Sequence, residues 1–213
     1  MELRCALCGI QACREQPGTV AYPDYCPMAN EVDALREARE AYEEEETRRL
    51  ALAAARTEAD RYPLETRVEE VMSFARRLAV TKLGIASCVG LIREARLLQG
   101  IFEANGFEVA SVCCKVGSIP KEAIGLTDEE KIHPGQFEAL CSPIGQAKLL
   151  NAAGTGLNVL VGLCVGHDSL FFQHSKAPVT VLIAKDRVTG HNPAAVLYTS
   201  HSYYSRLKPS SDR

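Results

Sequence analysis

The sequence predicts an α/β protein with a doubly wound, mostly parallel sheet that carries helices on both faces. Two observations support this fold class. From about residue 66 onward, short and largely apolar segments alternate with segments of helical periodicity. In addition, 46% of the 213 residues are apolar, which is enough for a sizeable core without disulfide bonds.

Three regions differ in composition. Residues 1–30 contain four cysteines and few bulky apolar side chains, so we expect a small knuckle that needs a metal to fold. Residues 31–62 are rich in Ala, Glu and Arg and lack Gly and Pro, which predicts one long charged helix, or two, capped by Asn30. We interpret residues 31–65 as a charged helical connector and residues 66–213 as the α/β domain.

The elements of the α/β domain follow from the alternation of the two periodicities. A first helix is expected at residues 66–80, where Val68, Val71 and Met72 share one face. The segments that predict strands are residues 83–87, 107–112, 137–140, 157–163 and 178–184. The helices expected after these strands are residues 91–106, 144–154, 168–174 and 193–207.

The chemistry of the nine cysteines depends on the compartment. The N-terminal MELRCALCG has no basic segment followed by an apolar one, and no run reaches the roughly 18 apolar residues of a membrane span. We therefore expect a cytoplasmic protein, in which many cysteines indicate metal binding or catalysis rather than disulfides. The net charge of −3 and the lack of a basic run indicate that neither nucleic acid nor a membrane is a partner.

Cysteines follow four of the expected strands. Cys88 follows the first, Cys113 and Cys114 the second, Cys141 the third and Cys164 the fourth. Because the carboxyl ends of parallel strands lie at one edge, where ligands bind, we expect these thiols to meet in one crevice. Thiolates there would suit Zn²⁺ or an iron–sulfur cluster, and the alternative is ordinary packing of buried free cysteines.

The N-terminal cysteines form a second set: Cys5, Cys8, Cys13 and Cys26, separated by two, four and twelve residues. A Cys-x-x-Cys pair chelates one centre across a tight turn. Four thiolates are the ligand set both of a structural zinc site and of a [4Fe–4S] cluster. The spacing matches neither ferredoxin pattern, so the identity of the metal is left open, with Cys26-Pro27 favouring iron slightly.

Basic and imidazole side chains are expected at the same edge of the sheet. Lys185 and Arg187 follow the last expected strand and could hold an anionic substrate, and Lys115 and Lys121 could join them. His191 could donate a proton or act as a further ligand. The alternative is that Asp186 pairs with its neighbours and that Asn192-Pro193 only starts the last helix.

A second line of chemistry is thiol catalysis. The segment Gly162-Leu163-Cys164-Val165-Gly166 fits the nucleophile-elbow pattern with Cys in place of Ser, on a strand-to-helix turn. His167, Asp168 and His191 are candidate partners for such a nucleophile. A cysteine hydrolase or amidotransferase that uses Cys164 is therefore one alternative function.

The segments CALCG, CCKVGSIPKEAIG, CSPIGQAKLLN, GLCVGHDSLF and KDRVTGHNP together resemble the uncharacterised cysteine-rich proteins grouped as domain of unknown function 1847. The resemblance covers nearly the whole chain. It implies metal binding in a family found chiefly in anaerobic prokaryotes, but it implies no reaction. It also implies Cys114 rather than Cys113 as the ligand after the second strand, and two ligand sets, Cys5, Cys8, Cys13, Cys26 and Cys88, Cys114, Cys141, Cys164.

From these patterns we expect two metal centres, with [4Fe–4S] clusters favoured and zinc as the alternative. The first would serve electron transfer or structure, and the second would be the active one. There Lys185, Arg187, His167 and His191 would bind a small anionic substrate or tune the potential. This predicts an iron–sulfur-dependent oxidoreductase or a sulfur-handling lyase with an electron-transfer partner. The alternative is a zinc-binding or metal-carrying protein without turnover.

Overall fold

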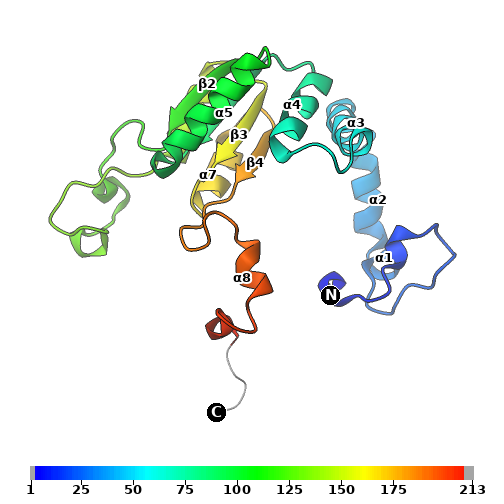
Figure 1. The fold of residues 1–213 in the computed structure, drawn as a ribbon. Coiled ribbons are helices and arrows are strands. Elements are labelled where there is room, and N and C mark those ends of the chain that lie inside the picture. The colour runs from blue at the N-terminus through cyan, green and yellow to red at the C-terminus, as the bar shows by residue number, and fades with distance from the viewer. Residues whose placement is uncertain (1–2, 209–213) are drawn as a thin grey trace. The chain divides into compact units, whose positions relative to one another are not determined.

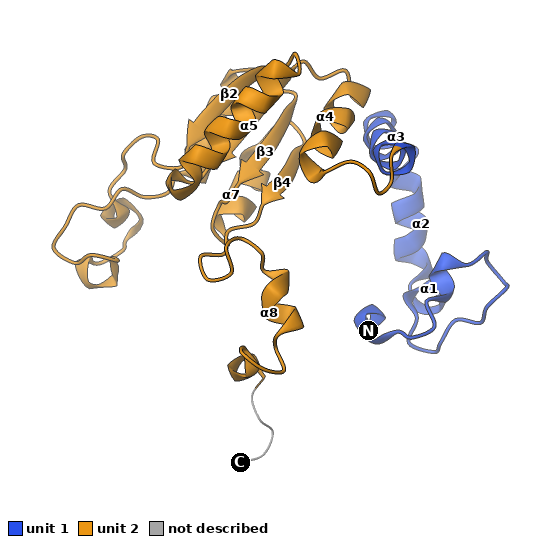
Figure 2. Cartoon of the chain, in the orientation of Figure 1, with its two compact units in different colours: residues 1–60 blue, residues 61–213 orange. Residues whose placement is uncertain are grey.

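The computed structural model describes residues 3–208 and separates into two compact units, residues 1–60 and 61–213 (Figure 2). The first unit contains the N-terminal cysteines and the charged helices, and the second contains the sheet. No helix in the described part of the chain is long and apolar enough to cross a bilayer.

The charged segment of the first unit forms two helices, α2 (Val32–Ala41) and α3 (Glu45–Asp60), after a single turn, α1 (Pro27–Asn30). The break falls at a run of acids, which places Glu45 and Glu46 in the first turn of α3, where the positive end of the helix dipole stabilises them. The predicted Asn30 cap is wrong. The Asn30 amide donates to the Asp24 and Cys26 carbonyls instead, and so closes the preceding turn.

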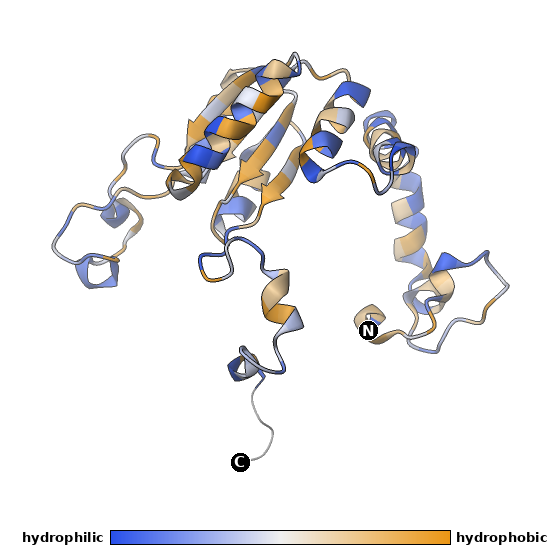
Figure 3. Ribbon diagram, in the orientation of Figure 1, coloured by the Kyte–Doolittle hydropathy of each residue, from blue (hydrophilic) through white to orange (hydrophobic). Residues whose placement is uncertain are grey.

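The second unit is built on a four-stranded sheet whose neighbouring strands are all parallel, in the order β2-β1-β3-β4. Its strands are β1 (Lys82–Ser87), β2 (Glu108–Cys113), β3 (Leu157–Val161) and β4 (Val179–Ile183). Figure 3 shows that these strands are mainly hydrophobic, whereas α2 and α3 carry many hydrophilic residues. The predicted α/β class with a parallel sheet is thus confirmed.

Helices connect and cover the strands (Figure 1). The helix α5 packs against β1 and β2, and α6 packs against the same two strands and against α7. In Figure 1, α5 lies in front of the sheet and α7 behind it. The helices of this unit are α4 (Arg67–Arg77), α5 (Ile92–Ala104), α6 (Pro143–Ala152), α7 (His167–His174) and α8 (Ala194–Tyr198).

Two predicted elements differ from the structure. Residues 137–140 form no strand, only an isolated antiparallel bridge between Pro120 and Ala139. The helix expected at 193–207 is reduced to α8 and a 3₁₀ turn, Ser205–Leu207. The Thr199 hydroxyl donates to the Ala195 carbonyl just where α8 ends, and such side-chain bonds to the backbone compete with helix continuation.

The core of the second unit contains one buried polar network at the start of β3. The fully buried Asn158 amide donates to the Ser175 hydroxyl and accepts from the Thr155 hydroxyl. Gly84 of β1 makes room for it, because a Cβ at Gly84 would lie 2.0 Å from Asn158 Oδ1. The close pairing of β1 and β3 therefore depends on a residue without a side chain.

Candidate functional site

Three cysteines reach the carboxyl edge of the sheet directly after strands. Cys88 follows β1, Cys114 follows β2, and Cys164 lies in the turn between β3 and α7. The backbone N–H of Cys88 donates to the Val161 carbonyl, and that of Cys114 donates to the Ser87 carbonyl, so the strand ends extend the sheet pairing to these residues. The expectation that parallel strands bring distant thiols to one edge holds for these three residues.

Cys141 reaches the same edge by another route, because no strand precedes it. The backbone N–H of Ser142 donates to the Cys114 carbonyl (2.7 Å), which ties the end of a long loop to the end of β2. Ser142 then caps α6 by accepting from the Gly145 N–H. The predicted reason for Cys141 was wrong, but the predicted location was right.

Three of the four thiols line one pocket of about 440 Å³, called the thiol pocket below, and the fourth is hydrogen-bonded to one of them. Cys88, Cys141 and Cys164 line it, and Cys114 lies buried behind them, 2% exposed and hydrogen-bonded to Cys141. The fully buried Gln146 stabilises the floor, since its Nε2 donates to the carbonyls at the ends of β1 and β2.

The adjacent residues Cys113 and Cys114 serve different surfaces. Cys113 ends β2 and lines a separate hollow with Arg96 and Gln99 of α5. Neighbouring strand residues point to opposite faces of a sheet, which explains why only Cys114 joins the other thiols. The geometry therefore agrees with the implied preference for Cys114.

The thiols of Cys114 and Cys141 form a hydrogen bond that shifts their pKa values in opposite directions. The hydrogen bond from Cys114 lowers the pKa of Cys141 to about 5, with help from Lys115, whose Nζ lies 3.3 Å from Cys141 Sγ. The same bond, together with burial, raises the pKa of Cys114. The hydrogen bond and Lys115 thus favour the charged form at Cys141 and the neutral form at Cys114.

Three helices begin beside these thiols. A 3₁₀ turn, Val89–Leu91, leads from Cys88 into α5, α6 begins two residues after Cys141, and α7 begins three residues after Cys164. The Val89 N–H donates to Cys114 Sγ at 3.3 Å. Helix N-termini carry partial positive charge and stabilise thiolates, so the pocket favours anionic sulfur.

The predicted cationic residues come together only in part. Arg187 and His167 line the thiol pocket, with Arg187 Nη2 3.2 Å from Cys164 Sγ. This contact raises the pKa of Arg187. Lys185 lies next to Cys88, because a Cβ at Gly90 would be 3.2 Å from Lys185 Nζ and 3.9 Å from Cys88 Sγ.

His191 differs from the other predicted site residues. Its Nδ1 accepts from the Asp186 N–H (3.1 Å) and its own N–H donates to the Asp186 carbonyl. These bonds close the turn between Asp186 and His191. His191 is not among the described residues that line the thiol pocket, so we assign it to the support of this turn.

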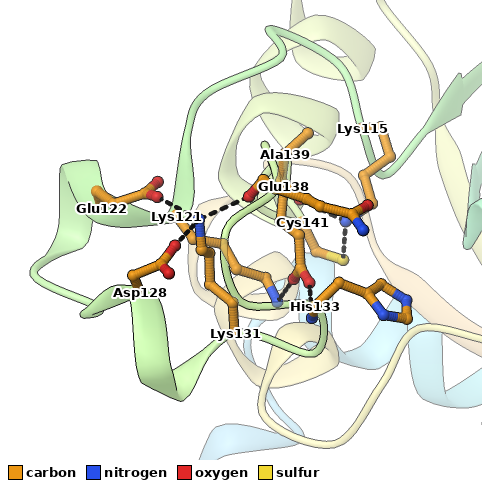
Figure 4. Close-up of polar contacts among 10 residues, drawn as sticks. Lys115, Lys121, Glu122, Asp128, Lys131, His133, Glu138, Ala139 and Cys141 are labelled. Carbon is orange, nitrogen blue, oxygen red and sulfur yellow. Dashed lines mark hydrogen bonds and ion pairs between the residues drawn. The ribbon is translucent and has the colours of Figure 1, made fainter.

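The loop of residues 115–141 contributes several residues to the lining of the pocket and has its own polar contacts, which Figure 4 shows. Lys131 is buried within it and contacts Glu122 (2.8 Å), Asp128 (2.6 Å) and the Gln136 carbonyl (2.6 Å). Lys121 pairs with Glu138, and this contact lowers the pKa of Glu138 to about 2. The loop is therefore held by ion pairs rather than by a core.

The apolar residues that this loop contributes were not anticipated. Ile124, Leu126, Ile132 and Leu140 all line the thiol pocket. They lie in a long irregular segment without periodicity, so the sequence carries no signal for their position.

The N-terminal cysteines gather partly around one tyrosine in the first unit. The pKa of Cys8 is lowered by backbone N–H groups of Gln11 and Ile10 and by the Tyr25 hydroxyl. The hydrogen bond to Cys8 raises the pKa of Tyr25, with smaller contributions from Cys26 and Cys5, and Cys26 is buried. Cys13 lies in an exposed 3₁₀ turn, Ala12–Arg14.

Within residues 3–208, no group of three or more His, Cys, Asp or Glu side chains is arranged to hold a metal ion. The two predicted ligand sets therefore stay predictions. What the structure provides is soft donors of the expected kind, four of them around the thiol pocket and three near Tyr25.

Residues 26–182 match the family described as "Protein of unknown function (DUF1847)". The chain belongs to this family. It is also 46% identical over 175 residues to the uncharacterized protein MJ0455 of Methanocaldococcus jannaschii, an alignment that covers 82% of this chain and 88% of that protein. The resemblance seen in the sequence is confirmed. The matched region includes the four thiols of the pocket and, of the N-terminal set, Cys26.

Proposed function

We propose that this protein is an iron–sulfur protein that acts as a redox or sulfur-handling enzyme on a small anionic substrate. One [4Fe–4S] cluster would lie in the thiol pocket and a second on the N-terminal set. The proposed ligands are Cys88, Cys114, Cys141 and Cys164 for the first cluster and Cys5, Cys8, Cys13 and Cys26 for the second.

The observation that carries this proposal is that thiols from three separate chain segments line one pocket and that a fourth, Cys114, is hydrogen-bonded to Cys141 of that pocket. Thiolate ligands select iron–sulfur clusters, zinc and copper(I). In a cluster each thiolate binds a different iron atom, so the thiols stand apart around the cofactor instead of converging on one ion. Cys114 and Cys141, which are hydrogen-bonded to each other, would have to move apart to bind different iron atoms, so the metal analysis described below is what distinguishes a cluster from a single zinc ion.

The topology of the sheet supports the same site. The chain passes from β1 outward to β2, then returns across β1 to β3 and continues outward to β4. We interpret this as the doubly wound arrangement predicted from the sequence. Its switch point lies between β1 and β3, where ligands bind in such folds, and these strands deliver Cys88 and Cys164.

The surrounding residues have definable roles in such an enzyme. A bound cluster would supply one-electron transfer. Lys115 and Arg187, which contact Cys141 and Cys164, would offset the negative charge of the cluster and so favour its reduced form. Arg187 would hold the anionic substrate, with His167 placed to exchange a proton.

The N-terminal knuckle is the second part of the proposal. Cys8, Cys26 and Cys5 all raise the pKa of Tyr25, Cys8 through a hydrogen bond. Small segments of this kind gain their folding energy from metal–thiolate bonds. All nine cysteines are free thiols in the structure, which suits the reducing cytoplasm where we place the protein.

Metal and acid-labile sulfide analysis of anaerobically purified protein tests this proposal. We expect iron and sulfide in equal amounts and absorbance near about 400 nm. Cys114→Ser should lose the iron of one cluster and Cys8→Ser that of the other. Cys113→Ser is the matched control, because its thiol lines a separate hollow, and it should keep both.

Other outcomes point to the alternatives. Zinc without sulfide would contradict the proposal and indicate a zinc-binding protein. Hydrolase activity in iron-free protein that is lost when Cys164 is alkylated would instead indicate thiol catalysis. In the structure, the Cys164 thiol contacts Arg187.

A further inference from the structure

We infer that the ligand of the thiol pocket is an organic anion with a hydrocarbon portion, such as a short-chain carboxylate. This inference rests on the anionic substrate of the proposed function and specifies its chemical class. The hydrocarbon portion would lie against the 115–141 loop, and the anionic group would lie against Arg187.

The two sides of the thiol pocket differ in chemistry. What we call the cationic side consists of the residues next to the thiols, namely Lys115, Lys121, His167 and Arg187. What we call the apolar side comes mainly from the 115–141 loop and consists of Ile124, Leu126, Ile132 and Leu140, together with Val89 after Cys88. The volume of about 440 Å³ falls within the range of small-molecule sites, about 300–1,000 Å³.

The apolar side is exposed although the loop is well ordered by its own ion pairs. Ile124 is 66% exposed and Ile132 is 76% exposed, whereas the neighbouring Lys131 is only 8% exposed. The interior of the loop is thus filled by an ammonium group with two carboxylate partners, and isoleucines stay on its surface. Exposed apolar side chains on a fixed wall of a pocket indicate a ligand that covers them.

The cationic residues of the pocket further restrict the chemical class of the ligand. Lys121 is paired with Glu138, and Lys115 donates to the Ala139 carbonyl and to Cys141. Arg187 contacts the half-buried Cys164 thiol, and its planar guanidinium has further N–H donors that match a carboxylate. An inorganic anion would satisfy Arg187 but leave the apolar side bare, whereas an organic anion covers both.

The test compares acetate, hexanoate, hexylamine and inorganic phosphate by isothermal titration calorimetry under anaerobic conditions. The full-length protein is used as purified, and its iron content is measured on the same sample. Each fully buried methylene group changes Kd about fourfold, so we expect hexanoate to bind at least about tenfold more tightly than acetate. Hexylamine should not bind.

Variants test the separate roles of the apolar and the cationic residues of the pocket in ligand binding. Leu126→Ala combined with Ile132→Ser should remove most of the preference for hexanoate over acetate, because the apolar surface is lost. Arg187→Gln should weaken both carboxylates by about tenfold or more. Ile101→Ala and Arg93→Gln, on α5 and outside the thiol pocket, are the matched controls and should change neither affinity.

Equal affinities for acetate and hexanoate, or phosphate as the tightest ligand, would overturn the inference. So would a hexanoate preference that persists in the Leu126 and Ile132 double variant. The metal content separates this result from the proposed function. Iron-loaded protein without chain-length preference contradicts only the inference, and a pocket-dependent preference in iron-free protein contradicts only the clusters.

Discussion

The two units of this protein are stabilised by different means. In the first unit, the buried apolar residues among those described are Ala12, Cys26 and Ala53, and the helices are mostly exposed. In the second unit, a continuous core of aliphatic and aromatic residues covers the sheet. The two proposed metal centres therefore differ in their relation to folding. The N-terminal centre would stabilise the unit in which it lies, whereas the centre in the thiol pocket would bind to a unit that its apolar core already stabilises.

Metal removal gives the largest expected difference between the units. Metal–thiolate bonds supply on the order of 10 kcal/mol to the folding of small knuckles, so residues 3–30 should lose their protection from hydrogen exchange. The strands β1 and β3 should keep theirs, because Leu83, Ile85 and Val159 are buried within the apolar core. Hydrogen exchange with and without a chelator measures both units in one sample, and equal loss in both would contradict the comparison.

Gly84→Ala should have the next largest effect, confined to the second unit. The new Cβ would lie 2.0 Å from Asn158 Oδ1, which disturbs a fully buried polar network, and we expect a loss of about 3 kcal/mol of unfolding free energy. Urea unfolding measures it. Gly100→Ala in α5 is the control: a Cβ there meets nothing within 4 Å, so it should stabilise by about 0.5–1 kcal/mol.

Lys131→Gln should loosen the 115–141 loop at a smaller cost. The variant loses two ion pairs, but Glu122 and Asp128 are about half exposed and can be hydrated, so we expect about 1 kcal/mol. Limited proteolysis should cut residues 121–136 faster while the sheet stays intact. Lys148→Gln on the exposed face of α6 is the control, and equal cleavage in both variants would argue against the role of Lys131.

The pH dependence of the same loop is the subtlest test. Lys121 and the His133 N–H hold the pKa of Glu138 at about 2, below its ordinary value of 4.5. A depressed carboxyl pKa contributes stability above pH 4.5, and this contribution is lost as the pH falls from 4.5 through about 2. NMR titration of the Glu138 carboxyl carbon should show the low midpoint in the native protein and a higher one in Lys121→Gln. An unchanged midpoint would remove Lys121 as the cause.

The parts of the site that follow from local patterns could be predicted from the sequence. Apolar strands ended by Cys88, Cys114 and Cys164 identify the edge of the sheet, because parallel strands fix where their ends lie. The doubly wound arrangement and the ligand sets are extensions of that logic and stay predictions.

What the sequence could not show depends on contacts between distant residues. The sequence of residues 137–140 predicts a strand, but Glu138 forms an ion pair with Lys121 and the segment forms a single isolated β-bridge. The burial of Lys131 likewise depends on carboxylates whose positions only the folded loop defines. Nothing in the spacing of these charged residues in the sequence distinguishes a buried ion pair from solvated side chains.

The delivery of thiols by separate strands has a consequence for the maturation of the protein. Cys5 and Cys8 are near neighbours in the chain, so under the proposed function they could bind metal while the chain is still being synthesised. Cys88 and Cys164 are brought together only when β1 and β3 have paired. An incomplete chain that lacks this pairing has therefore not yet formed the thiol pocket. If both proposed centres form, the N-terminal one can therefore assemble before the sheet is complete, whereas the one in the thiol pocket can assemble only afterwards.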